Sequence, residues 1–257
     1  MGIHLLSRTK AVTPRLLTKL ISENGIKASC GPTIPNDTDF IVNYGKITRG
    51  ANINANIIYN KQKQLRRLQE SEINAPILQC TENIELVDWM NVDDSLFPML
   101  GRKKKHSKGK DIVWIPDAKT ALRKKDKIAT RDFIVNYIEK KREFRVHVLG
   151  GRWVSVSEKI KDDDNGFRDP NIREELIWAH RYGWKHMVVK GDDEIRPELI
   201  ELALAAAKST NFEFGAVDVI QSVDDELYVL ELNSAPSLNN RRAEKYVNYF
   251  ISQYRGE

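Results

Sequence analysis

Two carboxylates and an amide near the carboxyl end of the chain have a spacing that could hold a metal ion. Two apolar, β-rich runs flank Asp224 and Asp225, and this pattern predicts a hairpin. A turn centred between these two residues places Asp218 directly opposite Glu231, and residues two apart on one strand share a face. Asp218, Glu231 and Asn233 are therefore expected to converge on one patch.

The chemistry of this patch favours a hard divalent cation. Two adjacent carboxylates repel each other unless a cation lies between them, and such oxygen ligands suit Mg²⁺ held jointly with substrate phosphates. The alternative is an ordinary hairpin with solvated acids. Acids at the turn would need no explanation, but Asp218 and Glu231 interrupt an apolar pattern away from the turn. We therefore expect a magnesium–phosphate site.

A second predicted hairpin, at residues 143–159, supplies cations and a further acid. Alternation selects a three-residue loop at 150–152, because a two-residue loop would mix polar and apolar side chains on each face. The polar pairs that then share one face are Glu143–Lys159, Arg145–Ser157 and His147–Ser155. This sheet would have an apolar back and a charged front suited to an anionic ligand, or, alternatively, a merely solvated front.

The lysine-rich run at residues 103–110 permits three interpretations. It is a solvated basic loop, a loop that closes over phosphates with its backbone N–H groups and cations, or a nucleic-acid patch. The third interpretation lacks interleaved aromatic residues on which bases could stack.

Length and composition limit the class of protein. The 257 residues suffice for one large domain or two to three small lobes, and 41% hydrophobic and 30% charged residues are typical of a soluble globular protein. No apolar run approaches the roughly 18 residues of a membrane span, and the N-terminus is unlike a signal peptide. Cys30 and Cys80 lack metal-like spacing, so a cytoplasmic location is expected. The net charge of +5 fits a polyanion such as ATP and also permits nucleic acid.

The remaining chain predicts the elements that must support these hairpins. A short strand at 3–6 precedes a helix with Thr13 as N-cap and Pro14 at its first helical position, which ends at Asn24 and Gly25. Residues 162–186 predict a loop-rich excursion near the site. The other expected elements are strands at 40–42, 97–102, 112–115 and 133–138 and helices at 60–70, 197–209 and 241–254.

Taken in this order, the elements resemble the ATP-grasp superfamily. GAVDV and YVLELNSAPSL are similar to its Asp…Glu-x-Asn metal signature followed by a small-residue–Pro turn, and REFRVHVLGG with VSVSEK and NKQKQLRRL followed by Ala75-Pro76 extend the likeness over nearly the whole chain. The most similar groups are ribosomal-protein glutamate ligases, D-alanine–D-alanine ligases and compact phage ATP-grasp proteins. The resemblance implies an α/β (α+β) fold in which two α+β lobes grip ATP.

The resemblance also implies a division of the chain. A small N-terminal α/β domain would occupy residues 1–58, before the ATP-grasp fold proper. The small nucleotide-binding lobe would occupy 59–140, and the large lobe with the magnesium site would occupy 141–257.

Metal and phosphate ligands can be carried over position by position. The resemblance implies that Asp218, Glu231 and Asn233 bind two Mg²⁺ ions, with Glu231 bridging them and Mn²⁺ as an alternative ion. Lys61 and Arg102 would contact the ATP phosphates. The family usually has lysine where this chain has Arg102, so a bidentate contact would replace a point charge there.

The nucleoside would be held by a hinge and covered by a lid. The resemblance implies that Tyr137, Ile138 and Glu139 form the hinge beside adenine, and that Glu143 binds the ribose hydroxyls. The lid loop would contain His106, Ser107 and Gly109.

Catalytic cations are less fully determined by the resemblance. Arg145 or Lys159 would face the transferred phosphate. The D-alanine ligases often have arginine two positions before the residue matching Asp218, where this chain has Ala216. This departure weakens a D-alanine-type assignment and leaves the acyl-phosphate cation to be found elsewhere, with Arg181 as the candidate.

The function that the resemblance implies is an ATP-dependent carboxylate–amine ligase. ATP would phosphorylate a carboxylate, an amine would attack the acyl phosphate, and an amide, ADP and phosphate would be released. The substrates would be small molecules or peptides, or the acceptor would be a macromolecule. The alternative is a non-catalytic ATP- or nucleic-acid-binding protein on the same fold. A homodimer is the default oligomer, and no membrane partner is expected.

Overall fold

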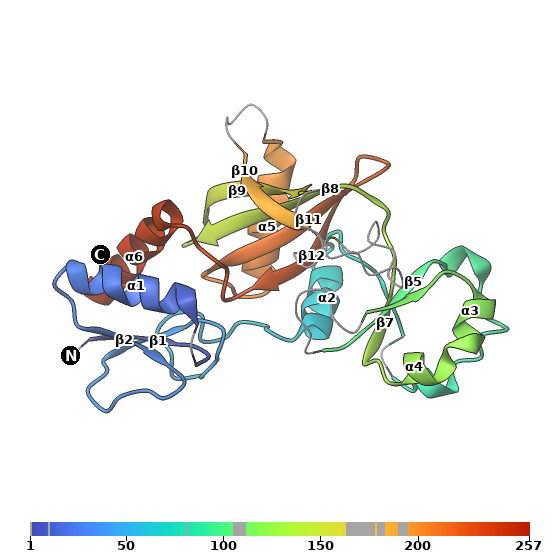
Figure 1. Ribbon diagram of the computed structural model, residues 1–257, viewed down its shortest axis with the longest axis horizontal. Coiled ribbons are helices and arrows are strands. Elements are labelled where there is room, and N and C mark those ends of the chain that lie inside the picture. Colours follow the sequence, from blue (N-terminus) through green and yellow to red (C-terminus); the bar gives the residue numbers. More distant parts are fainter. Residues whose placement is uncertain are drawn as a thin grey trace.

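Three β-sheets follow one another along the chain, with helices packed beside and between them (Figure 1). The computed structural model describes residues 2–9, 11–80, 82–104, 112–162, 178, 183–189 and 195–257. The five-stranded sheet occupies the centre of Figure 1, the N-terminal sheet lies at one end, and the four-stranded sheet lies at the other. This α+β arrangement agrees with the expected ATP-grasp fold.

The N-terminal sheet is parallel, with strand order β2-β1-β3. It contains β1 (Ile3–Leu6), β2 (Ala28–Gly31) and β3 (Phe40–Asn43), and α1 (Val12–Glu23) connects the first two strands. The expected N-cap at Thr13 is wrong, because the N-cap is Ala11, which makes no side-chain capping bond. Pro14 is therefore the third helical residue. It is tolerated there because the first-turn N–H groups have no partner within a helix.

The second sheet is antiparallel, with strand order β4-β7-β5-β6. Its strands are β4 (Leu78–Cys80), β5 (Met99–Arg102), β6 (Val113–Ile115) and β7 (Phe133–Asn136), and its helices are η1 (Ile84–Leu86), η2 (Asp94–Leu96), α3 (Ala118–Arg123) and α4 (Lys125–Ala129). The strand expected at 133–138 ends at Asn136. The next N–H, that of Tyr137, donates to the carbonyl of Pro98, and the chain then passes to the central sheet.

The central sheet is antiparallel, with strand order β10-β9-β8-β11-β12. Its strands are β8 (Lys140–Leu149), β9 (Arg152–Lys161), β10 (Trp184–Val188), β11 (Phe214–Ser222) and β12 (Leu227–Asn233). The prediction of a loop-rich excursion over 162–186 is therefore wrong at its end, because β10 begins at Trp184. Most of the remaining predicted excursion lies outside the described residues.

The hairpin of β11 and β12 has the predicted register at the site. Asp218 pairs with Glu231 and Ala216 pairs with Asn233. The register then shifts, and Val219 pairs with Val229. A bulge therefore lies between the site and the turn, and the turn is centred on Asp224 rather than after it.

The hairpin of β8 and β9 repeats this outcome. Arg145 pairs with Ser157 and His147 pairs with Ser155, as predicted. The three-residue loop is wrong, because Leu149 pairs with Arg152 across a two-residue turn. Its two glycines have φ values of 57° and 73°, the left-handed conformations that a tight type I′ turn requires. A bulge after His147 absorbs the additional residue.

The apolar back of the central sheet forms the main core. Phe144, Val146 and Val217 pack there with Leu199 and Ala203 from α5 (Pro197–Ser209). Leu65 and Leu68 of α2 (Lys61–Glu70) belong to the same core, so α2 packs on the central sheet. The opposite side, which we call the front face, carries the polar side chains of β8 and β9.

The side chain of Gln64 completes the outer edge of β12. Its Nε2 donates to the carbonyl of Leu232 at 3.2 Å, and its Oε1 accepts from the N–H of Leu232 at 3.2 Å. Farther along the same edge, the N–H of Val229 donates to the carbonyl of Asn74 at 2.8 Å. These contacts position the N-terminus of α2 beside the end of β12.

The C-terminal helix α6 (Asn240–Arg255) joins the N-terminal sheet to the central one. Tyr246 and Phe250 are fully buried among Leu5 and Ile21 on one side and Phe214 on the other, and α6 lies beside α1 in Figure 1. The division at 1–58, 59–140 and 141–257 stays a prediction. Among the described residues, no helix is long and apolar enough to span a bilayer.

Candidate functional site

The three predicted metal ligands converge at the end of the β11–β12 hairpin. Nδ2 of Asn233 donates to Oδ2 of Asp218 at 3.0 Å and to Oε1 of Glu231 at 3.4 Å. We call these three side chains the metal-ligand patch. Its geometry follows directly from the register of the hairpin, because the two carboxylates oppose each other and Asn233 lies two residues beyond Glu231.

Asp218 is neutralised from within its own sheet. Arg145 on β8 lies opposite Asp218 and forms a bidentate ion pair, with Nε to Oδ1 at 2.6 Å and Nη2 to Oδ2 at 2.8 Å. Burial alone would raise the pKa of Asp218, but Arg145 outweighs it and holds that pKa below its usual value. Burial opposes the charge of Arg145 as well, yet Asp218 keeps the pKa of Arg145 above its usual value.

Glu231 is neutralised from outside its sheet. Lys61, the first residue of α2, donates to Oε2 of Glu231, and Nη2 of Arg102, the last residue of β5, lies 3.3 Å from the same oxygen. Arg102 is buried, which lowers its pKa, and Glu231 partly offsets this effect. The two predicted phosphate-binding cations thus both contact a predicted metal ligand.

A second ion-pair cluster lies farther along the front face. Glu143 on β8 is buried and accepts from Nζ of Lys140 at 2.6 Å and from Lys159 on β9. Nζ of Lys140 also lies 4.6 Å from the ring centroid of Trp178, which stacks on Trp184 at 4.0 Å. Burial lowers the pKa of Lys140, and Glu143 counteracts it.

Within these two clusters of described residues, cations outnumber carboxylates. Three carboxylates, those of Asp218, Glu231 and Glu143, face five cations, so two positive charges are not balanced within this set. The five cations are Lys61, Arg102, Lys140, Arg145 and Lys159. Such an arrangement of charge attracts a polyanion.

The predicted hinge connects β7 to β8. Tyr137 packs edge-on against Trp114, with ring centroids 4.9 Å apart, and burial followed by repulsion from Glu139 raises the pKa of Tyr137 to about 12. Ile138 is half-buried and Glu139 is exposed. The carbonyl of Glu139 accepts from the N–H of Val223 at 3.1 Å, which ties the hinge to the turn between β11 and β12.

Two histidines on the front face had no role assigned from the sequence. His147 is fully buried, and burial, followed by Arg242 and Arg145, lowers its pKa to about 3. His186 on β10 has a pKa lowered to about 4, again chiefly by burial and then by Arg145. Both imidazoles are therefore neutral near pH 7.

Sequence reasoning also missed two cations. Lys140 lies in a run of four charged residues at 139–142, and only the structure shows that it contacts Glu143. Arg242 belongs to α6, and its Nε donates to Oγ of Ser155 at 2.8 Å. No sequence signal identifies Arg242, because its position depends on how α6 packs over the sheet.

Four of the predicted site residues cannot be placed. They lie outside the described residues: His106, Ser107, Gly109 and Arg181.

The metal-ligand patch fits a hard cation in its chemistry. Asp218 and Glu231 offer carboxylate oxygens, and a half-turn of the Asn233 amide would present Oδ1 where Nδ2 now bonds both carboxylates. Within the described residues, no group of three or more His, Cys, Asp or Glu side chains could hold a metal. The patch is compatible with this result, because its third member is an amide.

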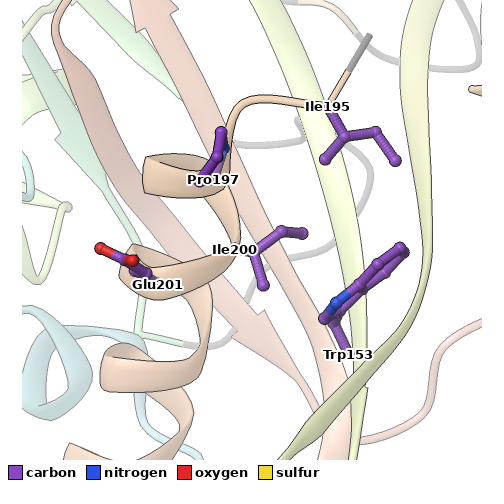
Figure 2. A pocket seen from close by; sticks show the side chains of 5 residues that line it. All are labelled: Trp153, Ile195, Pro197, Ile200 and Glu201. Carbon is purple, nitrogen blue, oxygen red and sulfur yellow. The ribbon is translucent and has the colours of Figure 1, made fainter. Parts of the chain in front are cut away.

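An apolar pocket of about 290 Å³ lies between β9 and α5, apart from this site. Figure 2 shows Trp153, Ile195 and Ile200 turned toward one another, with Glu201 pointing away. Its lining carries none of the paired charges of the front face.

The fold resembles those of several solved ATP-grasp enzymes. The ATP-grasp ligase PsnB with a minimal precursor is 13% identical, with a TM-score of 0.68 and coverage of 98% of this chain and 99% of that one. D-alanine–D-alanine ligase from Bacillus anthracis with ATP is 15% identical, with a TM-score of 0.67 and coverage of 100% and 97%. A ligase from Chryseobacterium gregarium associated with RiPPs, in complex with ADP and a leader and core peptide, is 14% identical, with a TM-score of 0.65 and coverage of 98% and 97%.

At these identities the solved structures establish the fold alone. A search of curated proteins finds no match. The sequence itself, however, matches the RimK-like ATP-grasp domain over residues 58–252, which is most of the chain and includes the metal-ligand patch. The chain therefore belongs to the RimK-like ATP-grasp family.

Proposed function

We propose that this protein is an ATP-dependent carboxylate–amine ligase. The observation that carries the proposal is the metal-ligand patch, which is surrounded by cations from α2, β5 and β8. A protein that only bound an anion would have no need of two opposed carboxylates within such a cluster. A magnesium–nucleotide complex needs both the carboxylates and the cations.

ATP would bind between the central and four-stranded sheets. In this proposal Lys61 and Arg102 turn from Glu231 to the phosphates, while Glu143 accepts hydrogen bonds from the ribose. Tyr137, Ile138 and Glu139 form the hinge beside adenine.

Asp218, Glu231 and Asn233 would hold two Mg²⁺ ions, with Mn²⁺ as an alternative. When bound, the ions neutralise phosphate oxygens and orient the nucleotide. One solved structure of PsnB contains Mg and ADP, which supports this choice of cofactor.

The remaining residues would stabilise the transferred phosphoryl group. Arg145 and Lys159 lie on neighbouring strands of the front face. Each would direct its positive charge toward the transferred phosphoryl group. The γ-phosphoryl group passes to a carboxylate, the amine nitrogen then bonds to the carbonyl carbon, and phosphate leaves. Similar ligases have been solved with precursor peptides, which supports a peptide as one substrate.

The test is the variant Glu231→Gln, which keeps the size of the side chain and removes its charge. We expect ATP turnover to be lost with the fold intact, as checked by ADP release with Mg²⁺-ATP across paired carboxylates and amines. Asp224→Asn, at the exposed turn of the same hairpin, is the matched control and should be unaffected. Unchanged turnover in Glu231→Gln would refute the metal assignment.

The alternative of a non-catalytic nucleic-acid binder depends on the lysine run at 103–110, most of which lies outside the described residues. A salt-sensitive DNA shift without ATP hydrolysis would favour it.

A further inference from the structure

Buried polar atoms without a protein partner gather on one part of the front face. Seven such side-chain atoms occur within the described ranges, and five of them belong to the front face of β8–β10 or to the residue that covers it. These five are Nε2 of His147, Oγ of Ser157, Nε1 of Trp184, Nδ1 of His186 and Nη2 of Arg242. Because buried polar groups are normally paired, such a concentration indicates a ligand site.

The sheet register places these groups together. Ser157 lies opposite Arg145, His186 lies opposite Lys159, and His147 lies opposite Ser155. We call His147, Ser157, His186 and Arg242 the polar subsite.

The polar subsite adjoins the metal-ligand patch. Only Ala216 separates His147 from Asn233 across the sheet, since it pairs with both. Two strand spacings, about 10 Å, therefore separate the backbones at these positions.

Hydrogen bonding determines which nitrogen of His147 carries the proton. The hydroxyl of Tyr246 donates its single proton to the carbonyl of Gly215 at 3.0 Å. It can therefore only accept from Nδ1 of His147, which lies 3.1 Å away. Nδ1 is protonated, and Nε2 presents a lone pair with no hydrogen-bond partner among the described residues. The lowered pKa of His147 agrees with a neutral ring.

Arg242 supplies the complementary donor. Its Nε donates to Ser155, which lies directly opposite His147, while its Nη2 has no hydrogen-bond partner within the part of the chain that the structure describes. The polar subsite thus offers a cationic donor beside a neutral acceptor. An α-amino acid carries the complementary pair, a carboxylate and an amine joined through one carbon.

We propose that the polar subsite binds the amine-bearing substrate as an α-amino acid, with its carboxylate at Arg242 and an amine N–H at Nε2 of His147. This assignment rests on the ligase activity proposed above. The amino acid reacts with its amine as the free base, and the hydrogen bond to His147 orients the nitrogen lone pair toward the acyl phosphate. The N–C bond forms as the C–O bond to phosphate breaks, and the departing phosphate takes the electron pair and the proton that nitrogen loses.

The experiment measures amino-acid binding rather than turnover. The full chain, labelled with ¹⁵N-histidine and saturated with Mg²⁺-ADP, is titrated with each common amino acid by calorimetry and NMR. We expect at least one amino acid to bind and to shift the Nε2 signal of His147. Its des-amino form, which lacks the amine, and its amide form, which lacks the carboxylate, should each bind at least about tenfold more weakly.

Arg242→Gln tests the carboxylate contact. We expect affinity for the amino acid to fall about 10- to 100-fold, with Mg²⁺-ADP affinity unchanged. Arg241→Gln, the exposed neighbour on α6, is the matched control and should bind normally. If Arg242→Gln does not fold, Ser157→Ala provides a smaller change in the same subsite and should weaken binding severalfold.

The outcomes separate this proposal from the one on which it rests. Failure to bind Mg²⁺-ADP would overturn the ligase assignment and this inference with it. Binding of Mg²⁺-ADP with no amino acid shifting His147 would mean that only water occupies the polar subsite, and would overturn this inference alone. Equal affinity of the amide form, or of Arg242→Gln, would also overturn it.

Discussion

The two carboxylates of the metal-ligand patch are neutralised in different ways. Asp218 is held by Arg145, its neighbour within the central sheet, through two short hydrogen bonds. Glu231 is held by Lys61 and Arg102, which reach it from a helix and from another sheet. The first arrangement is fixed by strand register. The second depends on how separate elements pack, so it can be exchanged for phosphate contacts without disturbing the central sheet.

The largest effect should follow from breaking the pair inside the sheet. Arg145→Met leaves the buried carboxylate of Asp218 without its bidentate partner, and we expect the free energy of unfolding to fall by about 3 kcal/mol. Urea denaturation monitored by circular dichroism measures this. Arg142→Met is the control, because Arg142 also lies on β8 but forms a more exposed ion pair, with Glu158 on β9, and its loss should cost under about 1 kcal/mol. Equal losses would show that Asp218 does not depend on Arg145.

The pH dependence of the free energy of unfolding is a second test of the buried ionisable groups within the central sheet. His147, beside Arg145, has a folded pKa of about 3 against an ordinary 6.5, so only the unfolded chain takes up its proton between these values. The free energy of unfolding should therefore fall as pH decreases from 6.5 toward 3, by on the order of 2–4 kcal/mol, with no contribution above that window. The depressed pKa of Asp218 adds a loss at the acidic end.

His147→Gln checks the source of this pH dependence. The variant removes the titrating ring, so its stability should vary less steeply between pH 6.5 and 4 in denaturation series. An unchanged slope would assign the acid sensitivity to other groups.

The smallest effect on stability should come from the exchangeable pair. Lys61→Met leaves Arg102 beside Glu231, so that carboxylate keeps a cation and the free energy of unfolding should fall by only about 1–2 kcal/mol. Affinity for Mg²⁺-ADP should nevertheless fall roughly tenfold, because the proposed function assigns Lys61 to the nucleotide phosphates. Calorimetry measures the affinity, and Lys63→Met on the exposed face of α2 is the control. A large loss of stability in Lys61→Met with normal affinity for Mg²⁺-ADP would show that the Lys61–Glu231 pair supports the fold rather than the nucleotide.

Sequence reasoning succeeded where local pattern determines geometry. Alternation placed Asp218 opposite Glu231 and Arg145 opposite Ser157, and both pairings are confirmed. It failed at both turns, because a bulge adds one residue between site and turn without altering the side-chain pattern at the site. A bulge leaves one residue of its strand unpaired, and the alternation of polar and apolar side chains does not reveal where this occurs.

Contacts between distant elements could not be derived from the sequence pattern alone. Lys61 and Arg102 were identified by resemblance to a family, since nothing in their local sequence indicates that they meet Glu231. Arg242 and Lys140 were missed for the same reason. Their positions follow from tertiary packing of α6 and from the start of β8.

The contact of Gln64 with β12 restricts how a polypeptide could approach this protein. An open edge strand presents N–H and C=O groups with which an extended peptide can pair. At β12 the amide of Gln64 and the carbonyl of Asn74 already occupy such groups. A peptide substrate would therefore not add as a strand beside Glu231, and the same closure protects the sheet from edge-to-edge aggregation.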